Sequence, residues 1–259
     1  MIKCKVCVIN HRGVILLYMS TTKKQARDHI LHSEQHANGG TLLRQIILGG
    51  QDGLVNVLGI VLALAAGTNS QAIVILGGLA ATFAESISMA AVAYTSGKAQ
   101  RDYYYKELER EEYELDHFPD VEREEIRLIY LKKGFRGKEL AKIVKTICSN
   151  RKRWLDTMMT EELGLSESKD IDPIREAIVV GLSSTVGSFI PLAPFFFLAP
   201  QFGIIPAIVI TTVALFIAGA YKGKTTLGTW WKSGIEMAII GIAAALIGYA
   251  IGVLVGVKV

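Results

Sequence analysis

Five long apolar windows are the feature that most restricts what this chain can fold into. They cover approximately residues 45–67, 71–95, 175–200, 203–221 and 233–257. A helix needs ~20 mostly apolar residues to cross the hydrocarbon core of a bilayer, and each window approaches or exceeds that length. The sequence therefore predicts an all-α membrane protein with five transmembrane helices.

The charged residues gather between the second and third windows. The chain has 28 Lys and Arg and 24 Asp and Glu residues, and 33 of these 52 lie in residues 97–170. This uneven distribution is typical of a membrane protein with one soluble insert, not of a soluble globule. We expect four parts: an N-terminal tail with an amphipathic helix (1–44), spans one and two (45–96), a cytoplasmic helical insert (97–170), and spans three to five (171–259).

The insert is rich in Glu, Lys, Leu, Arg and Tyr, which favour helices. Pro119 and the pair Gly134 and Gly137 interrupt it. We expect helices at residues 97–117, 120–133, 137–147 and 151–163, the first of them continuing the second span.

Basic residues in the connectors predict the orientation. Lys222, Lys224 and Lys232 lie between the fourth and fifth spans, and Lys23, Lys24, Arg27 and Arg44 precede the first. The connectors after the first and third spans carry no charge. The positive-inside rule places the N-terminus and the insert in the cytoplasm and the C-terminus outside.

Two acidic residues fall inside the predicted spans. Asp52 lies in the first, and Glu85 lies in the second, four residues before Met89 and four after Ala81. An intramembrane charge costs about 2.5–3.5 kcal/mol on insertion scales, so such residues are usually functional or paired. Carboxylates beside a thioether suit a transition metal better than calcium or magnesium. The alternative is that the acids form hydrogen bonds within the helix bundle and Met89 only packs.

Small residues and prolines mark two of the spans. Gly49, Gly50, Gly53 and Gly59 crowd the first, and small residues let transmembrane helices approach closely. A first helix paired with its own copy would place two Asp52 side chains around one axis. Pro191 and Pro194 in the third span remove two backbone hydrogen bonds, which is typical of a kink or a mobile half-helix.

Residues 107–125 form an acidic run of ten carboxylates with two basic residues, Arg110 and Arg123. It is either a solvated surface or a place where cations collect. The helical spacing of its glutamates favours shared faces for Glu107, Glu111 and Glu114, and for Glu122 and Glu125. Met158 and Glu162 form a similar pair on the last helix of the insert. Two helices bearing such pairs could surround a cation with oxygen ligands.

The cysteines indicate no disulfide framework. Cys4 and Cys7 form a C-x-x-C near the N-terminus, and no second pair completes a metal site. We expect a frayed tail there, although a metal or redox role fits the same pattern. The N-terminus does not resemble a signal peptide. No phosphate-binding loop is present, and nothing predicts nucleic-acid binding.

Several motifs in order resemble the vacuolar iron transporter family of plants, fungi and prokaryotes. They are His32-Ser33-Glu34-Gln35-His36, Gln51-Asp52-Gly53-Leu54, Leu64-Ala65-Ala66-Gly67, Ile87-Ser88-Met89, Trp154-Leu155-Asp156 through Met158-Met159 to Glu162-Leu163-Gly164-Leu165, and Pro191-Leu192-Ala193-Pro194. The resemblance runs from about His32 to the C-terminus. It implies a homodimer that exports Fe²⁺, and often Mn²⁺, from the cytosol in exchange for protons.

The resemblance also implies two metal sites. Asp52 and Met89 correspond to residues that line a pore at the dimer interface. The cytoplasmic metal ligands correspond to Glu111, Glu114, Glu122, Glu125, Met158 and Glu162. The family's pore glutamate falls at Ala81, and Glu85, one turn nearer Met89, is expected to replace it. Protons returning inward would compete for Asp52 and Glu85.

Other functions remain as alternatives. A ferritin-like iron oxidase uses two Glu-x-x-His pairs, and the insert has one, Glu114 with His117. A membrane-anchored metal buffer or sensor would bind metal without moving it. We expect a transporter and not an enzyme, with metal ions, protons and lipid as its partners and no resident cofactor. The order of preference among Fe²⁺, Mn²⁺, Co²⁺ and Zn²⁺ stays open. The expected location is the plasma membrane of a prokaryote, or the vacuolar membrane of a eukaryote.

Overall fold

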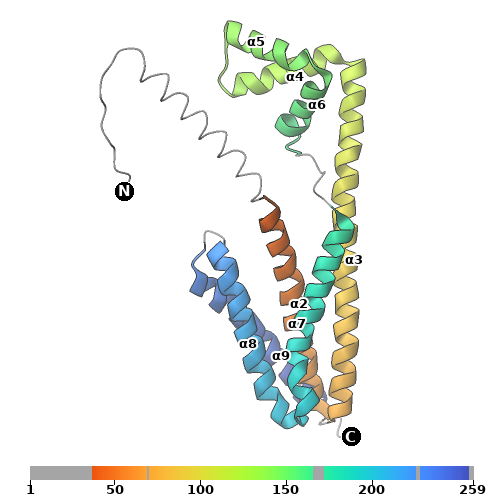
Figure 1. Cartoon of the computed structure of the whole chain (residues 1–259), viewed down its shortest axis with the longest axis vertical. Coiled ribbons are helices and arrows are strands. Elements are labelled where there is room, and N and C mark those ends of the chain that lie inside the picture. Colours follow the sequence, from red (N-terminus) through yellow and green to blue (C-terminus); the bar gives the residue numbers. More distant parts are fainter. Residues whose placement is uncertain (1–36, 69, 166–171, 226–227, 257–259) are drawn as a thin grey trace, which may run out of the picture.

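The computed structural model describes residues 37–68, 70–165, 172–225 and 228–256, and nearly all of them are helical (Figure 1). The helices are α2 (Ala37–Thr68), α3 (Gln71–His117), α4 (Pro119–Lys132), α5 (Gly137–Cys148), α6 (Arg151–Thr157), the π-helix η1 (Met158–Glu162), α7 (Pro173–Phe197), α8 (Pro200–Thr225) and α9 (Trp230–Val255). Cys4, Cys7 and most of the predicted amphipathic helix lie outside the described residues.

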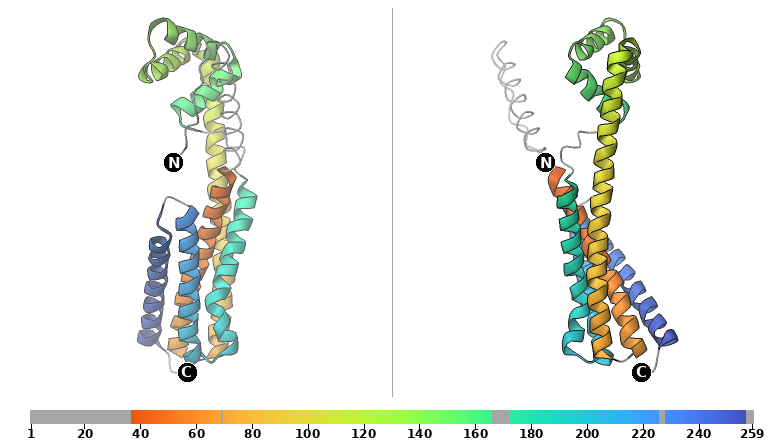
Figure 2. Two further views of the ribbon diagram at one scale, coloured as in Figure 1. Left: turned by 60° about the vertical axis from the view of Figure 1, so that its left-hand side comes forward. Right: turned by 90° about the vertical axis from the view of Figure 1, so that its right-hand side faces the viewer.

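Five of these helices are long and apolar enough to cross a membrane, as predicted: α2 from Leu42 onward, α3, α7, α8 and α9. The chain is therefore a multi-pass membrane protein. The five helices stand side by side in one bundle (Figure 2). Helix α2 contacts each of the other four, so the residues of α2 are held from several sides.

Helix α3 has 47 residues, and such a helix is about 70 Å long. It leaves the bundle and carries α4, α5, α6 and η1 at its far end (Figures 1 and 2). The predicted continuation of the second span through Gly97 is confirmed. A Cβ atom at Gly97 would lie 2.7 Å from a carboxylate oxygen of Glu176, so glycine lets α7 pack closely on α3 here.

The glycines of α2 serve contacts within the chain. A Cβ atom at Gly53 would lie 2.3 Å from the carbonyl oxygen of Ser184 on α7, and one at Gly49 would lie 2.2 Å from that of Val180. Farther along α2, Gly59 lies against Gly248 of α9. The expectation that these glycines pair α2 with its own copy is wrong for this face, because α7 and α9 already occupy it.

Helix α7 continues as one helix through Pro191 and Pro194. The kink or mobile half-helix expected at these prolines stays a prediction. Both prolines are buried. Neighbouring helices can hold such a helix together even though the prolines remove backbone hydrogen bonds. Its last turn is also supported by Gln71, whose side-chain amide donates a hydrogen bond to the carbonyl of Phe195 (2.9 Å).

The insert folds back on the far end of α3. Its apolar core joins Leu115 of α3, Ile126 of α4, Val144 of α5 and Trp154 of α6. The predicted helix over residues 151–163 is corrected: it is α-helical only to Thr157 and then becomes the π-helix η1. A π-turn is wider than an α-turn, so the residues after it are rotated about the helix axis.

The end of α8 and the start of α9 lie at the end of the bundle from which the insert projects, and the last turn of α9 lies at the other end (Figure 2). The last turn of α8 carries Lys222 and Lys224. Basic connector residues and the insert are therefore on one side, as the positive-inside argument requires. That this side is cytoplasmic stays a prediction.

Candidate functional site

The structure brings Asp52 and Glu85 together. Their carboxyl groups, on α2 and α3, lie close enough to interact with each other. The side chain of Asn56, one turn beyond Asp52 on α2, also reaches Glu85. Two carboxylates at such a distance repel each other strongly unless a proton or a cation lies between them. The structure thus places Glu85 near Asp52. That Glu85 replaces the carboxylate missing at Ala81 in transport stays a prediction.

Met89 and Ala81 lie one turn to either side of Glu85. Ala81 packs against the apolar core around α2, so it contributes packing at this level. Met89 is half-buried and lies on the same side of α3 as Glu85. Asn56, by contrast, is exposed on the surface of the single chain. A polar amide on the surface of an apolar helix indicates that something other than lipid contacts this face.

In the insert, two of the predicted ligands are buried carboxylates. Glu111 of α3 is 1% exposed and Glu122 of α4 is 3% exposed. Both side-chain oxygens of Glu111, and one of Glu122, have no hydrogen-bond partner among the described residues. Burying a carboxylate without a partner is costly, and proteins usually offset this by protonation, ion pairing or metal binding.

The surroundings of these glutamates change their protonation. Burial first, and then the charges of Glu162 and Glu114, raise the pKa of Glu111 to about 7. Burial, followed by the charges of Glu125 and Glu111, raises the pKa of Glu122 to about 7. The pKa of Glu162 is also raised, mainly by burial and then by Glu125. The five predicted glutamates therefore form one electrostatic cluster, which we call the glutamate cluster (Glu111, Glu114, Glu122, Glu125 and Glu162).

Met158 is fully buried in the apolar core of the insert, beside Leu115 and Ile126. Packing in the apolar core therefore accounts for the position of Met158. Metal binding by its thioether would be a second role. Glu162 ends η1, and the wide π-turn sets its direction relative to Met158. The expected i, i+4 alignment of this pair on an α-helix is thus wrong, although Glu162 belongs to the glutamate cluster.

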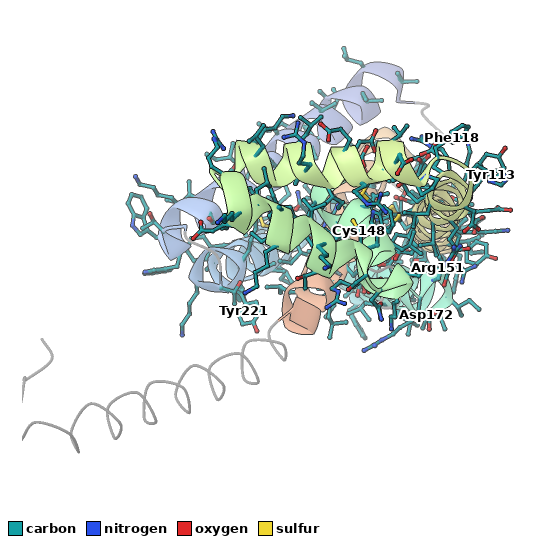
Figure 3. All side chains as sticks on the ribbon, turned by 90° about the horizontal axis from the view of Figure 1, so that it is seen from above. Tyr113, Phe118, Cys148, Arg151, Asp172 and Tyr221 are labelled. Atoms are coloured by element: carbon teal, nitrogen blue, oxygen red, sulfur yellow. The ribbon has the colours of Figure 1, made fainter. Side chains whose placement is uncertain are left out.

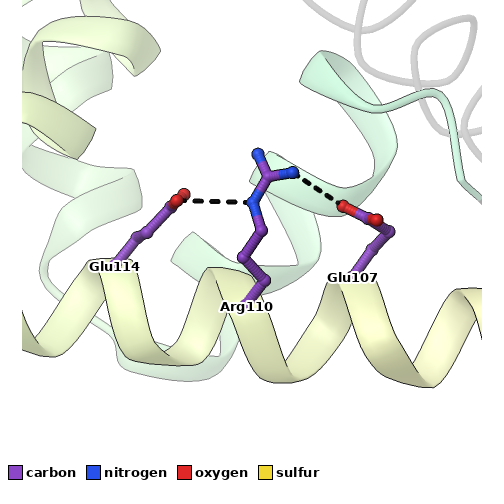
Figure 4. Close-up of polar contacts among 3 residues, drawn as sticks. All are labelled: Glu107, Arg110 and Glu114. Carbon is purple, nitrogen blue, oxygen red and sulfur yellow. Dashed lines mark hydrogen bonds and ion pairs between the residues drawn. The ribbon is translucent and has the colours of Figure 1, made fainter.

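Arg110 is the residue of this region that the sequence reasoning left unused. Its guanidinium pairs with Glu107 at 3.0 Å and with Glu114 at 3.3 Å (Figure 4). The spacings of three and four residues along a helix are the signal that could have revealed both pairs. One predicted metal ligand, Glu114, therefore has a cation beside it already.

His117 does not join the cluster. Its ring stacks on Tyr113 with centroids 3.9 Å apart, and its Nδ1 lies 2.8 Å from the Tyr113 carbonyl oxygen. Figure 3, which looks down on the insert, shows Tyr113 at the outer side of α3, with Arg151 on the adjoining α6. Arg151 pairs with Asp116 and ties α6 to α3. A Glu-x-x-His metal pair formed by Glu114 and His117 finds no support here.

No group of three His, Cys, Asp or Glu side chains is arranged to hold a metal ion in the part of the chain that the structure describes. The glutamates are nevertheless near enough to influence one another's charge.

Comparison with known proteins gives consistent matches over most of the chain. The model of the VIT family matches residues 43–253. A protein of Oryza sativa subsp. japonica named "Vacuolar iron transporter 1" is 32% identical over 228 residues, which are 88% of this chain and 90% of the relative. An Arabidopsis thaliana protein of the same name is 33% identical, over 86% and 89% of the two chains. The "Vacuolar iron transporter" of Plasmodium falciparum (isolate 3D7) is 30% identical, over 89% of each chain.

Proposed function

The chain belongs to the VIT family, and we propose that it transports a divalent transition metal, Fe²⁺ in the first place, across its membrane. The relatives are named as transporters, which agrees with the expectation that the chain is not an enzyme. The observation that carries the proposal is the approach of Asp52 and Glu85 on adjacent spans. Each of these carboxylates has the other beside it, and together they offer a divalent cation two negative ligands.

The insert captures the metal before it enters the bundle. Glu111 and Glu122 are buried, negatively charged when deprotonated, and without hydrogen-bond partners for three of their four oxygens. Carboxylates neutralise the charge of the ion, and the thioether of Met158 would favour a transition metal over Ca²⁺ or Mg²⁺. Mn²⁺ is accepted by the same ligand types, so we include it as a second substrate.

Metal binding displaces protons at both places. In the insert, a cation that binds Glu111 and Glu122 releases the protons that these groups hold near pH 7. Between Asp52 and Glu85, a proton and a metal ion compete for one position. Proton antiport follows from this competition: protons arriving from the outside release the metal there and return to the cytosol.

A second copy of the chain completes the membrane site. One chain offers Asp52, Glu85, Met89 and the exposed amide of Asn56, on a surface that lipid alone would solvate poorly. Two copies facing each other would double this ligand set around one axis. The homodimer therefore forms through the side of α2 that carries Asp52 and Asn56, because α7 and α9 cover the glycine faces.

Metal uptake into proteoliposomes tests the proposal. The purified protein is reconstituted into liposomes, and a pH gradient is imposed with the lumen more acidic than the outside. Accumulation of Fe²⁺ under anaerobic conditions, or of Mn²⁺, is followed with an indicator trapped in the lumen. We expect uptake that depends on the gradient and is lost in Asp52→Asn. Metal binding without uptake would instead identify a membrane-anchored buffer or sensor.

A further inference from the structure

Arg110 lies within the acidic face of α3. Its guanidinium bridges Glu107, one turn before it, and Glu114, one turn after it (Figure 4). Glu107 is 7% exposed, and Glu114 belongs to the glutamate cluster. Arg110 also acts on more distant members, because its charge partly opposes the rise in the pKa of Glu111 and of Glu162.

An arginine at this position cannot behave as a passive neighbour of a metal. Its guanidinium stays charged at any pH of interest and has five N–H donors that suit carboxylate oxygens. A divalent cation that takes Glu114 as a ligand must compete with this charge. Arg110 has a second carboxylate to use when it loses Glu114, because Glu107 is already in contact with it.

We propose that Arg110 is a resident counter-ion of the glutamate cluster: it competes with the metal for Glu114 and is held by Glu107 alone once the metal binds. This inference rests on the proposed metal capture by the insert. It makes Arg110 a positioning residue that lowers the affinity of the insert for metal, so that a captured ion can leave for the membrane site. Glu107 is the carboxylate with which Arg110 stays paired when the metal takes Glu114.

A purely structural role makes different predictions. If Arg110 only stabilised α3 through its pairs at i−3 and i+4, its removal would weaken the helix slightly and leave metal affinity unchanged or reduced. If it is a resident counter-ion, its removal strengthens metal binding. The two roles therefore predict opposite signs for the same variant.

The test is a Mn²⁺ titration of the full-length protein in detergent, in which free Mn²⁺ is measured by electron paramagnetic resonance. Arg110→Gln is expected to bind Mn²⁺ about three- to tenfold more tightly, because it removes one nearby charge and one competing ion pair. Arg110→Lys keeps the charge and should stay within about twofold of the unmodified protein. A Gln variant that binds Mn²⁺ equally or more weakly would overturn the inference.

Glu107 supplies the second arm of the experiment. Glu107→Gln leaves Arg110 with Glu114 alone, so Mn²⁺ should bind about threefold more weakly. The double variant Glu107→Gln with Arg110→Gln should bind as tightly as Arg110→Gln, because Glu107 acts only through Arg110. A double variant as weak as Glu107→Gln would make Glu107 a metal ligand and contradict the inference.

The outcomes also separate this inference from the proposed function. Glu111→Gln with Glu122→Gln should abolish the Mn²⁺ site of the insert. If that variant keeps the full stoichiometry and affinity, the capture site itself is wrong, and the inference about Arg110 falls with it. If the site is lost there but Arg110→Gln is unchanged, only the role of Arg110 is wrong.

Discussion

The chain carries carboxylates in two settings that differ in number and in surroundings. In the bundle, Asp52 and Glu85 stand together on adjacent helices, within the part of the chain that crosses the membrane. In the insert, five glutamates are spread over α3, α4 and η1, some buried and some at the surface. The same functional group is thus used sparingly in one region and in excess in the other.

This difference indicates a division of tasks. A charge in an apolar span is costly, so each acid that remains there is expected to be indispensable. In the glutamate cluster only Glu111 and Glu122 are buried. The other three glutamates are nearer to water and cost less, and their number increases the chance of meeting an ion. We therefore expect the membrane pair to control passage and the glutamate cluster to control capture.

The largest expected effect is the loss of passage when the membrane pair is broken. Asp52→Asn should lower the rate of Mn²⁺ uptake into proteoliposomes about a hundredfold or more, because it removes a direct ligand, and even indirect ligand contacts are worth about 10–100-fold. Glu236→Gln, which removes an acid from α9, is the matched control and should transport normally. Equal losses of uptake rate in both variants would show that any intramembrane acid matters, and would contradict a special role for Asp52 and Glu85.

The pH dependence of capture is the next largest effect. The pKa values of Glu111 and Glu122 are both raised to about 7, so both groups hold protons at pH 6 and lose them by pH 8. Because a metal needs the deprotonated forms, Mn²⁺ affinity of the insert should rise about thirty- to a hundredfold from pH 6 to pH 8. Glu111→Gln should flatten this profile. A profile unchanged by that substitution would mean that other groups control capture.

The metal-free insert should lose stability over a similar range. The folded state holds the protons of Glu111 and Glu122 more tightly than the unfolded state, since their pKa values rise from 4.5 to about 7 on folding. The free energy of unfolding therefore falls as pH rises from about 4.5 to about 7, by at most about 3 kcal/mol for each group. Hydrogen exchange of peptides from α3 and α4 measures this, and Mn²⁺ should reverse it. Equal protection at pH 5 and pH 8 would contradict the burial of these charges.

The smallest expected effect concerns the packing that holds α2 in place. Gly53→Ala would place a methyl group 2.3 Å from the Ser184 carbonyl oxygen, and such overpacking costs about 1–3 kcal/mol. Gly50→Ala is the matched control, because its methyl group would meet the nearest atom at 3.7 Å. Thermal unfolding in detergent should show a lower midpoint for Gly53→Ala alone. Similar midpoints would mean that α2 can shift, and that the position of Asp52 is not fixed by this contact.

Much of the architecture follows from local properties of the sequence. Apolar length predicts the five spans, and helix formers with Pro119, Gly134 and Gly137 predict the helices of the insert nearly to the residue. The spacing of Glu111 and Glu114, and of Glu122 and Glu125, predicts a shared face for each pair on its own helix. These features depend on neighbours along the chain, which a sequence displays directly.

Other features depend on contacts between distant segments. The π-turn at Met158–Glu162 interrupts a sequence that is suitable for an α-helix throughout, and nothing local marks it. The glycines of α2 could have faced a second copy equally well, until the packing of α7 and α9 is known. The burial of Glu111, which gives it a raised pKa, depends on how α4 and η1 cover α3.

The division between passage and capture can be measured directly from initial rates of Mn²⁺ uptake over a wide range of Mn²⁺ concentrations. We expect Glu111→Gln with Glu122→Gln to raise the Mn²⁺ concentration for half-maximal uptake and to leave the maximal rate nearly unchanged. We expect Asp52→Asn to remove uptake at every Mn²⁺ concentration. A maximal rate that collapses in the insert variant, or uptake by Asp52→Asn at the rate of the unmodified protein, would contradict the account.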